Sequence, residues 1–402
     1  MQTVKYFKSL NNFEKFLLVA LIVSPYTLLR IGFLGLAELI IIALFIKEFT
    51  DVGKGGILAF GPFSRFWLSY LIISLFGFAY NLIFLDYATG TLASLVFDFS
   101  AYVMLLMSCL LIEGSIKRKK INTYLFIKYF FLISSGIMLA LYILSFFTSS
   151  LLGLSLKYYI YFVPLAKNLH QISMFLVPLP FLGLRILLVE KNVKAKLLIC
   201  SLIVADVVMA SSTGSEKAII SLIVGSIVFV IFKFLYTLNL RSRRIFIFLL
   251  SFISGTILML NIEFAINWFV EYFEEIDMGG GRAMLYGKAI EVGLNSPLVG
   301  LGTGGHIYAD GKFWDAHQTF ITAFLQTGLV GVLILIILLF NVAKKAIYNP
   351  AIIAAFSAIF MYALGGDVLR RLPIWIMLVI IFYYEVGDER RLIKTKKGIL
   401  SV

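Results

Sequence analysis

Long apolar runs are the feature of this sequence that most limits its possible folds. Runs of about 15 to 23 mostly apolar residues recur along the whole chain, and a helix of that length crosses the roughly 30 Å hydrocarbon layer of a membrane. With 61% hydrophobic and 14% charged residues, the chain is too apolar for a water-soluble globule. Membrane barrels need alternating apolar and polar strands instead. We therefore predict an all-α, polytopic integral membrane protein.

About twelve spans are expected, forming one polytopic membrane domain over residues 1–402. One large late loop, 261–317, separates the ninth span from the tenth. In order, the expected spans are Phe16 to Leu29, Gly32 to Ile46, Phe66 to Leu85, Leu92 to Ile112, Tyr124 to Phe147, Asn168 to Val189, Leu197 to Ala210, Ala218 to Leu235, Ile245 to Leu260, Gln318 to Phe340, Ala351 to Leu364 and Leu372 to Val386.

Basic residues set the expected orientation. A net charge of +13 would suggest a nucleic-acid partner for a soluble protein, but here the basic residues fall in alternate loops, which is the positive-inside pattern. We therefore expect no nucleic-acid partner, both termini in the cytoplasm and loop 261–317 outside it. No cleavage-site pattern precedes the first span, which is interpreted as an anchor. Cys109 and Cys200 lie in apolar runs and are expected to be buried thiols, and no metal-ligand cluster is visible.

The late loop concentrates the polar residues, including two of the three histidines. Residues 262–276 show helical apolar spacing and predict an amphipathic scaffold helix on the membrane surface. Three glycines, 279–281, end it, and Arg282 then opens a short helix that stops before Pro297. An arginine at the start of a helix can bind a phosphate group, because its guanidinium and the first backbone N–H groups of the helix can all donate hydrogen bonds to the phosphate oxygens. The alternative is an arginine that faces lipid headgroups.

His317 is the candidate general base. Asp315 and Gln318 fit a capping box, which places His317 in the first turn of the tenth span. There the positive helix end disfavours imidazolium, so a neutral ring able to accept a proton is expected. Gly328 and Gly331 fall near the same helix face and predict close approach of another helix. A structural histidine is the alternative.

Other charged residues on the expected outer side are weaker candidates. Lys217 lies in the turn between the seventh and eighth spans, and Arg370 and Arg371 lie in the last outer turn. Side chains that extend to the membrane surface are the alternative for each. His170 opens the sixth span and is a second histidine candidate. Asp98 and Asp206 lie within spans, where a carboxylate usually faces the protein interior and pairs with a basic group.

These residues resemble the O-antigen ligase and polymerase family of bacterial envelope glycosyltransferases. The ligase pattern is His, then Asn, Ser or Gln, nine residues, Gly, two residues, and Gly, Thr or Tyr. Here His317 and Gln318 are followed by nine residues, Gly328, two residues and Gly331. The family's upstream Arg, aromatic, Pro and Gly-x-Gly-x-Gly pattern is matched by Arg282, Tyr286, Ala289, Pro297, Gly300, Gly302 and Gly304.

The resemblance implies a GT-C-like multi-pass protein of the bacterial inner membrane. Its donor would be a glycan on undecaprenyl diphosphate, transferred with inversion and without metal or cofactor. Its acceptor would be a lipid-linked glycan or lipid A core, with membrane lipids and a chain-length regulator protein as partners. His317 would be catalytic, Arg282 would bind the diphosphate, and Asp315, Gln318, Tyr286 and His170 would support the site. Family members often have Ser-Arg where this chain has Ser215 and Glu216, so Lys217, Arg370 or Arg371 would supply the second cation.

Three functions remain open at this stage. A polymerase joins one lipid-linked glycan to another lipid-linked repeat unit, and the modest loop favours this reading slightly. A ligase would move the glycan to lipid A core, and the complete histidine pattern favours that reading. A polysaccharide flippase is the non-enzyme alternative, although transporters place their polar residues at the bilayer midplane.

Overall fold

Helices make up most of the chain in the computed structural model, which describes residues 10–31, 34–52, 60–85, 92–118, 121–239, 242, 245, 256, 282–304, 306–309 and 311–384. The helices are α2 (Asn12–Val23), α3 (Leu36–Val52), α4 (Pro62–Tyr80) with a π-helical turn (Asn81–Leu85), α5 (Leu92–Lys117), α6 (Thr123–Phe147), α7 (Leu169–Leu176), α8 (Leu179–Leu187), α9 (Val193–Ser212), α10 (Glu216–Leu235), α13 (Arg282–Gly293), α14 (Thr319–Ala346), α15 (Pro350–Gly365) and α16 (Leu372–Phe382).

Six helical stretches in the described chain are long and apolar enough to cross a membrane. They are Pro62–Leu85, Leu95–Lys117, Thr123–Phe147, Leu169–Leu187, Glu216–Leu235 and Thr319–Ala346, and α15 and α16 are shorter apolar helices. Large apolar side chains point outward from them, including Phe76 at 69% exposure and Phe340 at 69%. Such surfaces suit lipid and would aggregate in water. The expectation of a helical membrane protein is therefore supported by length and composition.

Helices lie where most of the expected spans were placed, but only six helical stretches of the described chain are long and apolar enough to cross a membrane, so the number of twelve spans stays a prediction. The first expected span, Phe16 to Leu29, differs because its helix α2 ends at Val23. The expected span from Asn168 to Val189 is two helices, because Pro178 and Pro180 lack the N–H groups that would join α7 to α8. The segment expected from Ile245 to Leu260 lies outside the described residues apart from 245 and 256. The amphipathic helix expected over 262–276 also lies outside them.

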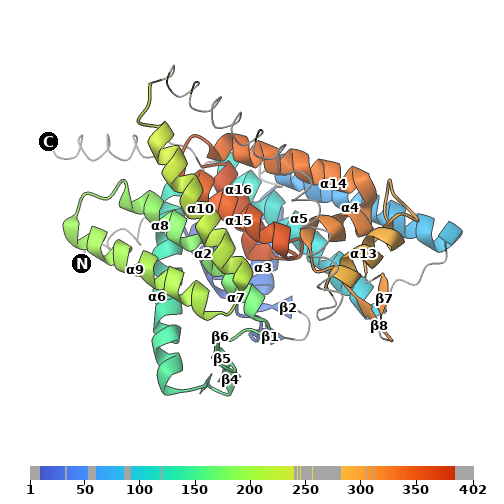
Figure 1. Ribbon diagram of the computed structural model, residues 1–402, viewed down its shortest axis with the longest axis horizontal. Coiled ribbons are helices and arrows are strands. Elements are labelled where there is room, and N and C mark those ends of the chain that lie inside the picture. Colours follow the sequence, from blue (N-terminus) through green and yellow to red (C-terminus); the bar gives the residue numbers. More distant parts are fainter. Residues whose placement is uncertain are drawn as a thin grey trace.

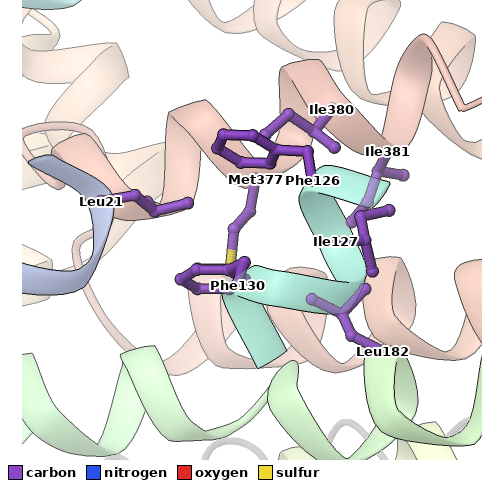
Figure 2. Close-up of a pocket in the computed structure, with 8 residues that line it drawn as sticks. All are labelled: Leu21, Phe126, Ile127, Phe130, Leu182, Met377, Ile380 and Ile381. Atoms are coloured by element: carbon purple, nitrogen blue, oxygen red, sulfur yellow. The ribbon is translucent and has the colours of Figure 1, made fainter. Parts of the chain in front are cut away.

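The apolar core is closely packed around α8 and α15, since α8 contacts α6 and α15, and α15 contacts α10 and α16. Gly225 of α10 lets that helix approach α15 closely, since a side chain there would press on Phe181 and Ala358. A cavity of about 10 Å³ lies between α2, α6, α8 and α16. Figure 2 shows the side chains that line it, which are Leu21, Phe126, Ile127, Phe130, Leu182, Met377, Ile380 and Ile381. Apolar walls and this small volume leave no room for a ligand.

The two cysteines differ in their surroundings. Cys109 is buried in α5 as expected, whereas Cys200 is exposed on α9, and neither forms a disulfide. The prediction of a buried thiol was therefore wrong for Cys200. Its helix turns an apolar face outward, and exposure of this kind is ordinary for a helix that faces lipid.

Short antiparallel hairpins cover one end of the bundle. They are β1–β2 (Arg30–Ile31, Leu34–Gly35), β3–β4 (Ser150–Leu151, Leu154–Ser155), β5–β6 (Lys157–Tyr158, Tyr161–Phe162) and β7–β8 (Ile307–Ala309, Lys312–Trp314). Figure 1 shows α13 and β7–β8 gathered beside α4, α5 and α14. A small second core of Leu285, Ala289, Val292, Leu301, Ile307, Ala316 and Leu325 ties α13 and its following loop to α14.

Candidate functional site

The start of α14 is held against the turn that joins α15 to α16. The Thr319 hydroxyl donates to the Gly366 carbonyl oxygen at 2.6 Å and accepts from the Val368 N–H at 3.1 Å. The Gln318 amide donates to the Leu364 carbonyl oxygen at 3.1 Å. These bonds bring residues 315–319 and 364–371 together, so His317, Asp315, Arg370 and Arg371 belong to one site.

Arg370 is the centre of an ion-pair cluster in this site. Its guanidinium contacts Asp98 Oδ1 at 2.5 Å, Asp315 Oδ2 at 2.7 Å and Asp367 Oδ2 at 3.5 Å. Burial alone would lower the pKa of Arg370, but the three carboxylates raise it well above its usual value. Arg370 therefore keeps its charge and holds together segments that are far apart in sequence. A guanidinium already engaged by three carboxylates is a poor diphosphate ligand, and Arg371 and Lys217 are stronger candidates.

Asp315 pairs with Arg370 and does not cap α14. The cap is Gln318, whose side-chain oxygen accepts from the Ile321 N–H at 2.6 Å. The prediction of a capping box between Asp315 and Gln318 was wrong, because the buried guanidinium attracts the carboxylate more strongly than a helix end does. Burial would raise the pKa of Asp315, but Arg370, with smaller effects of His317 and Arg371, lowers it below its usual value. His317 and Arg371 thus lie within electrostatic reach of this carboxylate.

His317 is exposed and lies in a strained turn. Its φ is +53°, in the left-handed region that side chains other than glycine seldom adopt. Because α14 begins at Thr319, the ring stands before the helix and not in its first turn, which corrects the predicted position. Strain of this kind is typical of functional sites, where the surrounding structure holds the residue in place. The turn presents an imidazole to the space outside the bundle.

A buried polar network connects this cluster to the membrane-spanning helices. Gln326 of α14 accepts from the hydroxyls of Tyr70 at 3.1 Å and Tyr102 at 2.5 Å, and its amide donates to Asp98 Oδ2 at 3.3 Å. Asp98 is 1% exposed, and its partner proves to be Arg370. Asp98 was predicted from the sequence to be a buried carboxylate. Tyr70, Tyr102 and Gln326 were not predicted as site residues, because each lies in an apolar run like that of any other span.

Further basic and polar groups surround the same turn. The Lys217 side chain lies against Gly365 and Gly366, and the Tyr362 hydroxyl is 3.4 Å from His170 Nδ1. Among the described residues, Nε of Arg371 is buried without a hydrogen-bond partner. Burial, the charge of Arg370 and the nearby Arg30 of β1 lower the pKa of Arg371. Sequence reasoning did not select Arg30, although a basic residue on the expected outer side departs from the positive-inside pattern.

Two further candidates, Arg282 and Tyr286, and the histidine His306 lie upstream of His317 in the late loop. Arg282 is the first residue of α13, as predicted, but its side chain lies outside the described part of the structure. Tyr286 lies on the same helix and is half-buried. His306, the other histidine of the late loop, is buried with Nε2 3.1 Å from the Gly302 carbonyl oxygen, which is a structural position.

The glycine pattern builds an interlock between the loop and α14. At Gly328 the backbone leaves helical geometry, with φ +62° and ψ −164°. The freed N–H groups of Leu329 and Val330 donate to the carbonyl oxygens of Pro297 and Leu298, at 2.8 and 3.2 Å. In return, Leu301 and Gly302 donate their N–H groups to carbonyl oxygens of α14 at 2.9 and 3.0 Å.

The turn and loop segment Pro297–Gly302 therefore occupies the position at Gly328 where another helix was expected. A side chain at Gly328 would collide with the backbone of Leu298, and one at Gly300 with the backbone of Gln326. These glycines serve a close backbone contact, which satisfies the polar groups exposed by the break.

Comparison with known protein families and with curated proteins finds no match for this chain. The fold defines the chain as a helical protein suited to a membrane. The site adds an exposed histidine, a paired carboxylate and several cations at one end of the bundle.

Proposed function

We propose that this chain is a membrane glycosyltransferase that acts on undecaprenyl-diphosphate-linked glycans at the outer face of the bacterial inner membrane. The supporting observation is the strained, exposed turn at His317 beside Asp315 and Arg371. A histidine held in this way suits proton transfer, and cations at the same end of the bundle suit a diphosphate. The histidine and glycine patterns of the resembled family fall on this turn and on the interlock behind it.

In the proposed reaction, the acceptor hydroxyl oxygen attacks the anomeric carbon of the donor sugar from the face opposite the diphosphate. The bond between that carbon and the diphosphate oxygen breaks, and undecaprenyl diphosphate leaves with the electron pair. His317 takes the hydroxyl proton as the new bond forms. Because Arg370 already neutralises Asp315, this carboxylate positions the turn and does not compete for the proton.

Cations must offset the charge of the departing diphosphate. Arg371 and Lys217 lie at the turn after α15, and Arg282 begins the helix that packs on α14. We assign diphosphate binding to Arg282, Arg371 and Lys217. Arg370 is assigned to positioning, because its guanidinium is occupied by carboxylates. Changing Arg282 to Lys keeps a charge but removes the two-pronged donor, so donor use should weaken more than for an exposed Lys312→Ala change.

The test of the base is His317→Ala in purified protein with a lipid-linked glycan. Loss of general-base assistance should reduce transfer by about 10² to 10⁴-fold. Lys312→Ala is the matched control, since Lys312 is exposed in the same loop on β8. Wild-type transfer by His317→Ala at matched expression would reject the base assignment, and His170 would be tested next.

Polymerase is the proposed type of transfer. Deleting the gene and separating the envelope glycans on a gel distinguishes the types. Single repeat units still attached to their acceptor indicate a lost polymerase, and glycan left on undecaprenyl diphosphate indicates a lost ligase. Purified protein that moved lipid-linked sugar across liposomes without lengthening or transferring glycan would instead establish a flippase.

A further inference from the structure

A separate groove opens at the outer ends of α6 and α9, beside the β5–β6 hairpin. Its volume is about 300 Å³, at the lower end of the range for small-molecule sites. Unlike the small core cavity, it is open and has both polar and aromatic walls. None of its residues takes part in the site around His317.

Aromatic rings form one wall of this outer groove. The Tyr142 ring lies edge-on to Phe146 and to Phe162, each with centroids 5.0 Å apart. Lys157 Nζ lies 5.4 Å from the centre of the Phe146 ring, which places a cation at the rim. The exposed Phe146 ring and the half-buried Tyr142 ring offer flat apolar surface beside a single positive charge, and the buried Phe162 ring supports Tyr142 from behind.

Serine residues of α6 and α9 also line the groove, and the oxygens of the exposed Ser211 and the half-buried Ser212 on α9 are available as acceptors. Ser145 donates its hydroxyl to the Tyr142 carbonyl oxygen at 2.7 Å. Ser211 and Ser212 donate to carbonyl oxygens one turn earlier in α9, at 2.9 and 2.8 Å. Since the Ser212 hydrogen is used in this way, the 3.0 Å contact between Tyr142 and Ser212 has Tyr142 as donor. These four hydroxyl hydrogens are all used within the protein.

This distribution of donors and acceptors selects the ligand. A phosphate group accepts hydrogen bonds and would face the serine oxygens with nothing to receive from them. A sugar hydroxyl both donates and accepts, so it can donate to the serines and accept from Lys157. The C–H face of a pyranose ring suits the aromatic wall.

The outer groove also adjoins the candidate active site. The Tyr161 ring packs directly on Gly214, and a side chain at residue 214 would overlap this ring. The φ of Gly214 is +71°, which also favours glycine at this position. Gly214 belongs to the turn that leads into α10 and Lys217. Tyr161 therefore lines the groove on one side of this turn, while Lys217 lies against Gly365 and Gly366 on the way to Arg371.

We propose that the outer groove binds a sugar residue of the glycan. This deepens the proposed function by giving the glycan a place beside the turn that leads to Lys217, the cation that would hold its diphosphate, and to that extent it rests on that function. The sugar's apolar face lies on Tyr142 and Tyr161, and its hydroxyls bond to Ser211, Ser212 and Lys157.

Saturation-transfer NMR on the full chain in lipid nanodiscs tests this inference. Nanodiscs are needed because glucoside and maltoside detergents carry sugars of their own. The probes are methyl glycosides of glucose, galactose, N-acetylglucosamine and rhamnose. At least one should receive saturation from the wild-type protein, and Tyr161→Ala should weaken its binding about tenfold through the lost aromatic face.

Tyr159→Ala is the matched control, because Tyr159 lies in the same hairpin turn, is 82% exposed and does not line the groove. Ser212→Ala removes an acceptor without adding bulk and should also weaken binding, whereas Tyr159→Ala should leave it unchanged. His317→Ala should reduce transfer by about 10² to 10⁴-fold and keep sugar binding. A protein that binds the sugars but transfers no glycan would defeat the proposed function and leave this inference standing.

Three results would overturn the inference. The first is the absence of saturation transfer to every glycoside, and the second is equal transfer with wild type and Tyr161→Ala. The third is displacement of the bound glycoside by dihexanoyl phosphatidylglycerol with loss of that displacement in Lys157→Gln, which would make the groove a lipid-headgroup site.

Discussion

Buried charge decides the arrangement of single residues at this site. From the sequence, Asp98 is recognisable as a carboxylate inside an apolar span, which needs a partner. The partner is not recognisable, because Arg370 lies 272 residues later and only the fold brings the two together. Asp315 is a second example. The sequence pattern of a capping box predicted that Asp315 caps α14, whereas in the fold its carboxylate pairs with the distant Arg370.

Removing Asp98 should destabilise the protein strongly. In Asp98→Ala the Gln326 amide loses its acceptor and Arg370 loses its closest carboxylate, a change that typically costs about 3 to 5 kcal/mol for a buried pair. Glu190→Gln is the control, because Glu190 pairs with Lys128 near the surface and such pairs contribute about 0 to 1 kcal/mol. Thermal unfolding in detergent should show a large loss for the first variant only. Equal midpoints would contradict a stabilising role for the cluster.

Acid should weaken the same cluster through Asp315. Its pKa is lowered in the folded protein, so it binds protons less readily there than in the unfolded chain. Its stabilising contribution is therefore complete above its unfolded pKa, about 3.9, and is lost as the pH falls through the lower folded value. Asp315→Asn should be less stable than wild type at pH 6, and this difference should shrink below about pH 4. A difference independent of pH would exclude this charge effect.

At the scale of elements, the break in α14 is the feature that sequence reasoning missed. A glycine in an apolar helical pattern usually marks a close helix contact, and nothing in residues 319–346 announces an interruption. The break is visible only when the Pro297–Gly302 segment is seen to bond to both sides of it. The helices themselves were predictable because their apolar length and capping residues are local properties, as with Asn122 before α6 and Asn349 before α15.

Gly328→Ala should disrupt this interlock. Its φ and ψ belong to a region that is open to glycine almost alone, and the added carbon would meet the Leu298 backbone. A loss of at least about 2 kcal/mol is expected. Gly136→Ala in α6 is the control, since no atom lies within 4 Å of the added carbon and helix propensity should make it neutral or up to about 1 kcal/mol more stable. Size-exclusion yield and unfolding midpoint measure both. If Gly328→Ala had the wild-type yield and unfolding midpoint, the break in α14 at residue 328 would be rejected.

For the whole molecule, the positive-inside pattern predicts that Ser150 lies outside the cytoplasm and Lys191 inside it. In a chain with both cysteines replaced, a cysteine at Ser150, in the exposed β3–β4 hairpin, should react with an impermeant maleimide in intact spheroplasts. A cysteine at Lys191, in the turn between α8 and α9, should react only after permeabilisation. The opposite result would place the His317 site in the cytoplasm and remove the proposed substrate.

The pairing of Asp98 with Arg370 also has a consequence for biogenesis. A ribosome makes about 5 to 20 residues per second, so α5 waits on the order of tens of seconds for its counterion. During that time the carboxylate needs water, a proton or an insertion factor to shield it from lipid. We therefore expect the chain to become stable only once the turn between α15 and α16, which carries Arg370, has been made. Chains truncated before Arg370 should be degraded faster than full-length chains in a pulse-chase experiment, and Asp98→Asn should lengthen the life of the truncated form by relieving the unpaired charge.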